Sequence, residues 1–233
     1  LVKLKAHHIQ AYDEAYKEWW TIGQHLFNLP FAQYQDPTAF IKKLDNGTAK
    51  IKDDKYLNGF FHIVDDTLKY GAGKQSLGID YSTEVADFSS GKSAVMQQGV
   101  WTIDSILKIN PKLHFGMFAI PLTNDAAQTK LPVDVPAYYV INKDSKHLEA
   151  AKQFLGWLHK NGQKYLVDSF KGSPAFKSLK TTPKLGPLAA DLTKYVKAGK
   201  TEPWAFLQWP AGANQQFGAP LQAYMAGVKT KAQ

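Results

Sequence analysis

Apolar residues recur at spacings of three and four through the first ninety residues, a pattern typical of amphipathic helices. The clearest case runs from Leu57 to Tyr70, with apolar side chains at positions 57, 60, 61, 64 and 68 and a stop at Gly71. Similar patterns predict three more helices here, at residues 11–28 (closed by Pro30), 36–44 and 80–88. We therefore expect the first part of the chain to be helical.

The pattern changes after residue 90. Ser93–Gln97 is a short apolar run between Gly91 and Gly99, too short for a buried helix and suited to an interior strand. Two more strands are predicted at residues 115–120 and 135–141. Further helices are predicted at residues 103–109, 145–161, 185–196 and 217–225, with an irregular connection at 171–187. Helices mixed with short strands indicate an α/β fold.

The stretch from Phe88 to Trp101 reads Phe-x-x-Gly-Lys-x-Ala-x-Met-x-x-Gly-x-Trp. It resembles the signature of family 1 extracellular solute-binding proteins, the maltose-binding-protein-like sugar receptors of ABC importers. Two later segments resemble the same family in the same order: Phe115–Leu122, like its Phe-Gly-x-x-x-x-Pro-x strand, and Tyr138–Ser145, like its strand leading into a Ser-Lys-x-x-Glu-Ala-Ala-x-x-Phe-Leu helix. The resemblance covers most of residues 10–230.

This resemblance implies a periplasmic-binding-protein-like (type II) C-terminal lobe, helix-rich with a small mixed sheet. The family's chains are longer at the front, so we expect a C-terminal fragment whose N-terminal lobe is largely absent. Residues 1–141 would begin the C-terminal lobe, with a hinge strand at about 135–141. Residues 142–170 would be a helical segment of the missing lobe, and residues 171–233 would return to the C-terminal lobe.

The composition narrows the possible partners. The formal net charge is +8, but the lysines are spread along the chain and arginine is absent. Arginine dominates bidentate recognition of phosphate and guanine, so its absence weighs against nucleic-acid binding. There is no cysteine, which excludes disulfides and cysteine-ligated zinc, and no apolar run reaches the length of a membrane span.

Enzyme motifs are missing too. The sequence has no Gly-x-Ser-x-Gly, no phosphate-binding glycine loop and no His-Glu-x-x-His, and His7-His8 is a terminal pair without a metal-site spacing. We expect no catalytic residues, metal or cofactor. Two alternatives stay open: a glycoside hydrolase, whose paired carboxylates need not be close in sequence, and a lectin-like or peptide-binding module.

Tryptophans and amides are the candidate ligand-binding groups. Sugar rings have apolar C–H faces and polar rims, so a receptor needs aromatic platforms and fixed hydrogen-bonding groups. The candidate platforms are Trp101, Trp209, Trp204, Trp19 and Trp20. The candidate rim residues are Gln98, Asp104, Gln208 and Asn214. The structural alternative for each tryptophan is a place in the hydrophobic core.

The resemblance implies the substrate-binding component of an ABC transporter, which captures a sugar or oligosaccharide outside the cell and closes about a hinge. Its expected partners are a carbohydrate ligand and the transmembrane subunits of the importer, with no direct membrane span. The full-length protein would be extracellular, either a lipid-anchored lipoprotein at the cell surface or periplasmic.

Overall fold

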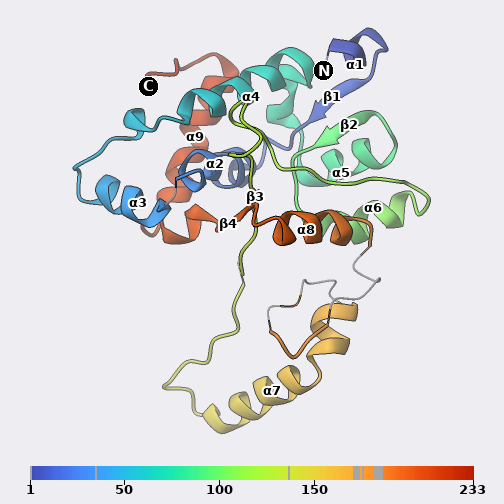
Figure 1. Cartoon of the computed structure of the whole chain (residues 1–233), viewed down its shortest axis with the longest axis vertical. Helices are drawn as coiled ribbons and strands as arrows, with labels where there is room; N and C mark the ends of the chain where they lie inside the picture. Colours follow the sequence, from blue (N-terminus) through green and yellow to red (C-terminus); the bar gives the residue numbers. More distant parts are fainter. Residues whose placement is uncertain (1, 35, 136, 170–173, 175, 181–185) are drawn as a thin grey trace.

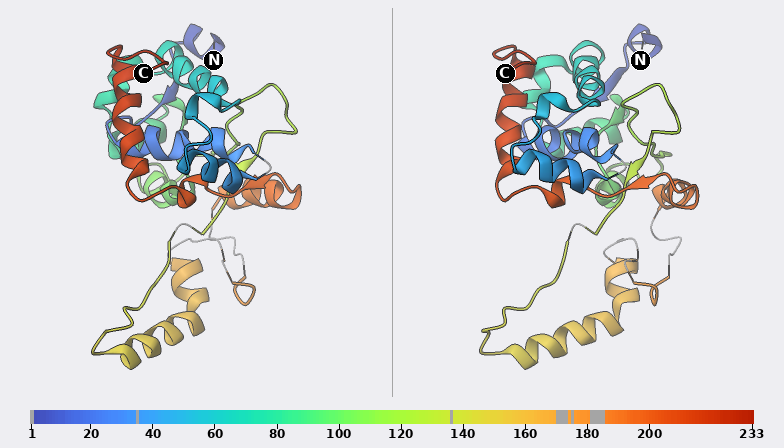
Figure 2. Two further views of the ribbon diagram at one scale, coloured as in Figure 1. Left: turned by 90° about the vertical axis from the view of Figure 1, so that its left-hand side faces the viewer. Right: turned by 60° about the vertical axis from the view of Figure 1, so that its left-hand side comes forward.

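A helix-rich body and a projecting arm make up the chain in its computed structural model (Figure 1). The structure describes all residues except 1, 35, 136, 170–173, 175 and 181–185. The arm extends away from the body in every view (Figure 2). No helix in the described part of the chain combines the length and the apolar character that crossing a membrane requires.

Two parallel strands lie at the centre of one side of the body. Strand β1 (Gln10–Asp13) pairs with β2 (Ser93–Met96), with Tyr12 opposite Val95 and Asp13 opposite Met96. A parallel pair needs a long crossover, and here it is the helical stretch between the two strands. The strand predicted at 93–97 is thus confirmed, although it is half-buried and has only β1 as a partner among the described residues.

The helix predicted over residues 11–28 is wrong in its first part, where β1 lies. Burial alternates along β1, and the pairing that stabilises it comes from a strand about eighty residues later, so local spacing does not reveal it. Helical structure begins at Trp19 and continues through the π-helical turn η1 (Thr21–Leu26) into α2 (Asn28–Ala32). Pro30 does not close this helical stretch, as was predicted, but lies inside α2, which continues to Ala32.

The other helices predicted in the body are confirmed. The Asp36 carboxylate accepts the N–H of Ala39 and begins α3, and Asp80 caps α5 in the same way through Thr83. The remaining body helices are α1 (Val2–Ala6), α3 (Pro37–Asp45), α4 (Leu57–Tyr70), α5 (Tyr81–Ser89), α6 (Ile103–Ile109), α8 (Leu188–Lys197) and α9 (Ala213–Ala226). The helix predicted at 185–196 is α8, and Leu185 lies outside the described residues.

The core of the body lies between η1, α2, α4 and α9. Its largest buried side chains include Tyr16, Phe31, Phe60 and Met225. Helix α9 crosses η1 so closely that a Cβ atom added to Gly23 would lie 2.5 Å from the backbone nitrogen of Gly218. The two helices can approach this closely only because both residues are glycines.

The strand predicted at residues 115–120 does not form. The segment is extended, and its backbone is held by side chains of α8: the N–H of Met117 donates to Asp191 Oδ2 at 3.1 Å and the N–H of Ala119 donates to the Tyr195 hydroxyl at 3.0 Å. Side-chain acceptors on one helix thus take the place of a neighbouring strand.

The arm is inserted between two adjacent strands. Strand β3 (Leu131–Pro132) runs parallel to β4 (Thr201–Glu202). Between them the chain leaves the body, forms α7 (Leu148–Lys160) and the π-helical turn η5 (Gln163–Ser169), and returns through α8 (Figure 1). Both strand pairs described in the structure are parallel, where a mixed sheet was expected.

The arm differs from its predicted form in two respects. The described part of residues 135–141 is extended but unpaired, with Val140 87% exposed, so the predicted hinge strand does not form. The apolar residues of α7 stand at helical spacing, which predicts one buried face, yet Leu158 is buried while Phe154 is 56% exposed. The turn η5 covers part of α7, where Tyr165 packs against Trp157 with ring centroids 5.2 Å apart.

The glycine crossing of η1 and α9 predicts a stability difference between two alanine variants. Gly23→Ala should lower the free energy of unfolding by about 1–3 kcal/mol because the new methyl group has no room. Gly78→Ala is the matched control: nothing lies within 4 Å of the added Cβ, and we expect a change of less than about 0.5 kcal/mol. Urea denaturation measures both, and a Gly23→Ala variant as stable as the parent chain would contradict the described packing.

Candidate functional site

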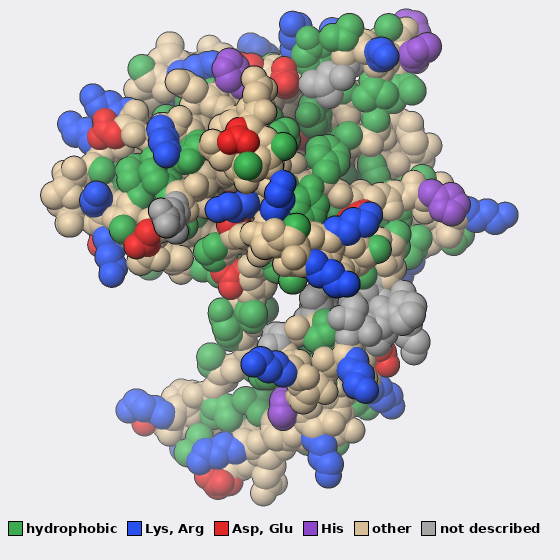
Figure 3. Space-filling view, viewed as in Figure 1, with side chains coloured by type: hydrophobic (Ala, Val, Ile, Leu, Met, Phe, Trp, Pro, Cys, Tyr) green, Lys and Arg blue, Asp and Glu red, His purple; other side chains and the backbone are tan. Residues whose placement is uncertain are grey.

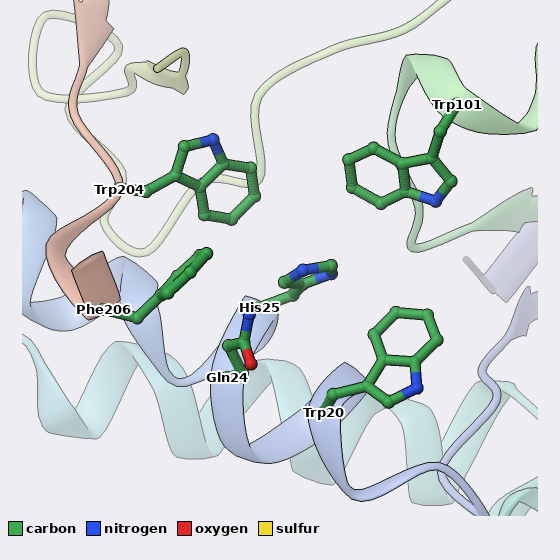
Figure 4. A pocket seen from close by; sticks show the side chains of 6 residues that line it. All are labelled: Trp20, Gln24, His25, Trp101, Trp204 and Phe206. Atoms are coloured by element: carbon green, nitrogen blue, oxygen red, sulfur yellow. The ribbon is translucent and has the colours of Figure 1, made fainter. Parts of the chain in front are cut away.

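A cavity of about 300 Å³ opens on the body between three separate segments (Figure 4). Its size is at the lower end of the range of about 300–1,000 Å³ that is usual for small-molecule sites. Its lining residues are Trp20, Gln24, His25, Trp101, Trp204 and Phe206. The first three lie on the helix at residues 19–26, Trp101 follows β2, and the last two lie at the short helical turn η7 (Ala205–Gln208).

Trp101 is held at the rim by the backbone that follows β2. The chain passes Gly99 into the turn η4 (Val100–Thr102), and a Cβ atom added to Gly99 would lie 2.1 Å from the Trp101 ring. Gly99 therefore lets the indole approach the main chain this closely. The ring is 46% exposed, and its Nε1–H donates to Gln98 Oε1 at 3.2 Å.

His25 lies at the centre of the aromatic side chains. Its ring centroid is 5.0 Å from that of Trp20 and 5.2 Å from those of both Trp101 and Trp204. Burial lowers the pKa of His25 to about 4, so the imidazole is neutral at pH 7. A neutral imidazole offers one N–H donor and one acceptor nitrogen. The site thus has a small polar group among large apolar rings.

The segment at η7, which comes late in the sequence, forms the remaining side of the cavity. Trp204 and Phe206 pack against each other with ring centroids 5.2 Å apart. The N–H of Phe206 donates to the buried Asn28 Oδ1 at 3.0 Å, which fixes η7 to α2. The two rings therefore face His25 from a position set by a buried hydrogen bond.

Three of the five predicted tryptophans line the cavity, namely Trp20, Trp101 and Trp204. Trp209 does not: its ring packs against Phe31, Phe217 and Phe27 at centroid distances of 5.2, 4.9 and 6.1 Å, at the hydrophobic core. Trp19 packs on α9, where its Cβ atom would lie 2.7 Å from a Cβ added to Gly218.

The four predicted rim residues do not line the cavity either. Gln98 accepts a hydrogen bond from the indole of Trp101. Asp104 is exposed in the first turn of α6, and Gln208 is exposed and accepts a hydrogen bond from Thr38. Asn214 lies half-buried in the first turn of α9, and its Oδ1 has no hydrogen-bond partner among the described residues.

Three lining residues were not predicted from the sequence: Gln24, His25 and Phe206. Gln24 is four residues after Trp20, a spacing that puts two side chains on the same face of a helix. That spacing was the available signal for Gln24. Phe206 carried no comparable signal beyond its place between two tryptophans.

The cavity has a distinct chemical character. None of its six lining side chains bears a carboxylate or an ammonium group. Within the described residues, no group of three or more histidine, aspartate or glutamate side chains is placed to hold a metal ion. The arrangement suits an uncharged ligand that has both apolar faces and hydrogen-bonding groups.

The different surroundings of two tryptophans predict different costs of truncation. Trp209→Ala should lower the free energy of unfolding by about 3 kcal/mol, because it leaves a cavity among the core phenylalanines. Trp101→Ala should cost about 1 kcal/mol or less, because nearly half of the ring is already exposed. Chemical denaturation of the two variants measures the difference; equal destabilisation would show that Trp101 is a core residue.

The fold resembles that of several solved binding proteins. The open conformation of a putative binding protein, MsmE from Bacillus subtilis, matches with a TM-score of 0.70 and 20% identity over 99% of this chain and 58% of its own. The raffinose complex of the binding protein RafE matches with a TM-score of 0.64 and 18% identity over 98% and 64%. Apo RafE from Streptococcus pneumoniae matches with a TM-score of 0.61, 18% identity, and coverage of 98% and 63%.

This chain therefore spans about three fifths of the length of the solved chains that it matches. No curated protein sequence matches it. The family model described as "Bacterial extracellular solute-binding protein" matches residues 3–165, more than half of the chain. This family is non-enzymatic, which removes the glycoside hydrolase alternative. The chain belongs to the bacterial extracellular solute-binding proteins.

Proposed function

We propose that this chain forms one wall of the substrate-binding component of an ABC importer and that a sugar or oligosaccharide binds in the cavity around His25. The observation that carries the proposal is the meeting of Trp20, Trp101 and Trp204 from three separate segments. Their rings offer flat apolar surfaces for the C–H faces of a sugar, and His25 offers a donor and an acceptor for hydroxyl groups.

The charge of the cavity supports an uncharged ligand. A peptide would need groups that pair with its charged termini, and the lining has none. On the face that Figure 3 shows, the lysines are scattered over the body and the arm rather than gathered at one place. RafE was solved in complex with raffinose, and a carbohydrate ligand of that structural neighbour is consistent with a carbohydrate here.

The arm supports a second part of the proposal, namely a two-lobed intact protein of the type II architecture. The body would be the C-terminal lobe, residues 135–141 the hinge, and residues 142–170 a helical segment of the N-terminal lobe. The rings of Phe154, Trp157 and Tyr165 form a contiguous row on the arm, and Phe154 and Trp157 are about half exposed. Packing by a second lobe would cover this row.

The proposed transport cycle follows from these parts. The two lobes would close over the sugar by bending at the hinge, and the closed form would dock on the transmembrane subunits of the importer. The full-length protein would act outside the cell, either in the periplasm or as a lipoprotein anchored at the cell surface. A second lobe would also exclude water from the cavity and so strengthen each hydrogen bond to the sugar.

A single wall should bind sugar weakly. A dissociation constant of about 1 μM for the intact protein would correspond to about −8.2 kcal/mol. If half of this free energy came from the wall described here, the remaining −4.1 kcal/mol would correspond to about 1 mM. We therefore expect weak but selective binding by this chain alone.

Titration of the chain with a panel of mono- and oligosaccharides that includes raffinose tests the function. We expect tryptophan fluorescence to change saturably, with dissociation constants of about 1 mM for the preferred sugars. Trp101→Ala should weaken binding at least tenfold through loss of a stacking surface. Phe154→Ala, on the arm and outside the cavity, is the matched control and should bind like the parent chain.

Two results would count against the proposal. A response to peptides but to no sugar would reject the carbohydrate assignment. Saturable binding at micromolar concentration would instead show that this wall is sufficient by itself, and the two-lobed part of the proposal would fail.

A further inference from the structure

The side chain of Gln98 connects the rim of the cavity to the interior of the body. Its Oε1 accepts the indole N–H of Trp101 at 3.2 Å, and its Nε2 donates to Glu84 Oε2 at 2.6 Å. Both ends of the amide are therefore used, each by the group whose hydrogen-bonding character matches it. Neither Gln98 nor Glu84 lines the cavity.

Glu84 is a fixed anchor for this connection. It lies on α5 and has no solvent exposure. Burial raises the pKa of Glu84 to about 8, opposed by the hydrogen bond from Gln98 and reinforced by Asp13. Glu84 also interacts electrostatically with three other titratable groups, namely Glu14, Tyr16 and Tyr81. No cation is among these neighbours, so burial favours the neutral form of the carboxyl group.

A buried carboxyl group beside other buried carboxyl groups lowers the stability of the folded chain. The Glu84 carboxyl group accepts hydrogen bonds from Gln98 and from the backbone of Gln97 and Ala15, while the Oε2 atom of neighbouring Glu14 is buried without a hydrogen-bond partner among the described residues. The hydrogen bond to Gln98 is the contact of the Glu84 carboxyl group that leads toward the site.

We infer that Gln98 and Glu84 are positioning residues of the proposed sugar site, holding the Trp101 indole in the orientation that faces His25. This inference rests on the proposed function, since it assigns Trp101 a ligand to stack on. The Gly99 backbone and the His25 ring both pack against the indole, and neither contact uses the direction of its N–H. The hydrogen bond to Gln98 supplies that direction, and the bond to Glu84 keeps the Gln98 amide from rotating.

Three substitutions separate positioning from general stability. Gln98→Leu removes both hydrogen bonds. Glu84→Leu removes the acceptor beneath Gln98. Glu84→Gln is the conservative control: it keeps a carbonyl oxygen as the acceptor and matches the neutral form of the carboxyl group in shape and charge. Gln98 is only half-buried, so its variant tests the inference even if Glu84→Leu fails to fold.

The first readout is the hydrogen exchange of the Trp101 indole N–H by NMR, with the resonance assigned by Trp101→Phe. We expect Gln98→Leu and Glu84→Leu to increase the exchange rate at least fivefold, and Glu84→Gln to remain within twofold of the parent chain. An unchanged rate in Gln98→Leu would overturn the inference, and so would equal rates in Glu84→Leu and Glu84→Gln.

The second readout is affinity for the preferred sugar of the panel. Gln98→Leu and Glu84→Leu should weaken binding about fivefold, and Glu84→Gln should restore it. Undiminished affinity in Gln98→Leu would overturn the role in binding. If the parent chain binds no sugar, the proposed function fails, whereas the exchange measurement still decides whether Gln98 and Glu84 position the indole.

Discussion

The site depends on the parallel pairing of β1 with β2. Asp13 stands opposite Met96 near the carboxyl ends of the two strands, and parallel strands bring these ends to the same edge. The chain that leaves β1 goes on to Trp20 and His25, and the chain that leaves β2 goes on to Gly99 and Trp101. One register thus brings together two aromatic groups that are about eighty residues apart in the sequence.

The other contacts of the site reinforce this placement. Buried Asn28 draws η7 onto α2 and brings Trp204 to the same place. The close crossing of Gly23 and Gly218 fixes the helix that carries His25 against α9. Rigid elements therefore hold each ring, which reduces the conformational entropy that a ligand would otherwise have to remove. A preformed aromatic cavity with a neutral polar centre is the result.

Local signals predicted the parts of the fold that are local in origin. The Asp36-Pro37 start of α3, the apolar spacing of α4 and the cap of α5 each depend on residues within one or two helical turns. The first part of the helix predicted at residues 11–28 was misassigned because β1 exists only through its distant partner. Residues 115–120 were misassigned because Asp191 and Tyr195, on a later helix, take the hydrogen bonds that a strand would have made.

The candidate site could be predicted only in part, because the position of each ring depends on segments that are distant in the sequence. Composition identified the tryptophans, but it did not separate Trp209, which packs with core phenylalanines, from Trp101, which stands at a rim. That distinction depends on tertiary packing. His25 was missed because a lone histidine in a helix has no signature, and its importance comes from three rings supplied by other segments.

The most direct test of the central claim is a crystal structure of this chain soaked at high concentration with the oligosaccharides of the titration panel. The account predicts a sugar ring packed on Trp101 or Trp204, with a hydroxyl group within hydrogen-bonding distance of the His25 imidazole. A sugar bound elsewhere on the body, with the cavity around His25 left empty, would contradict it.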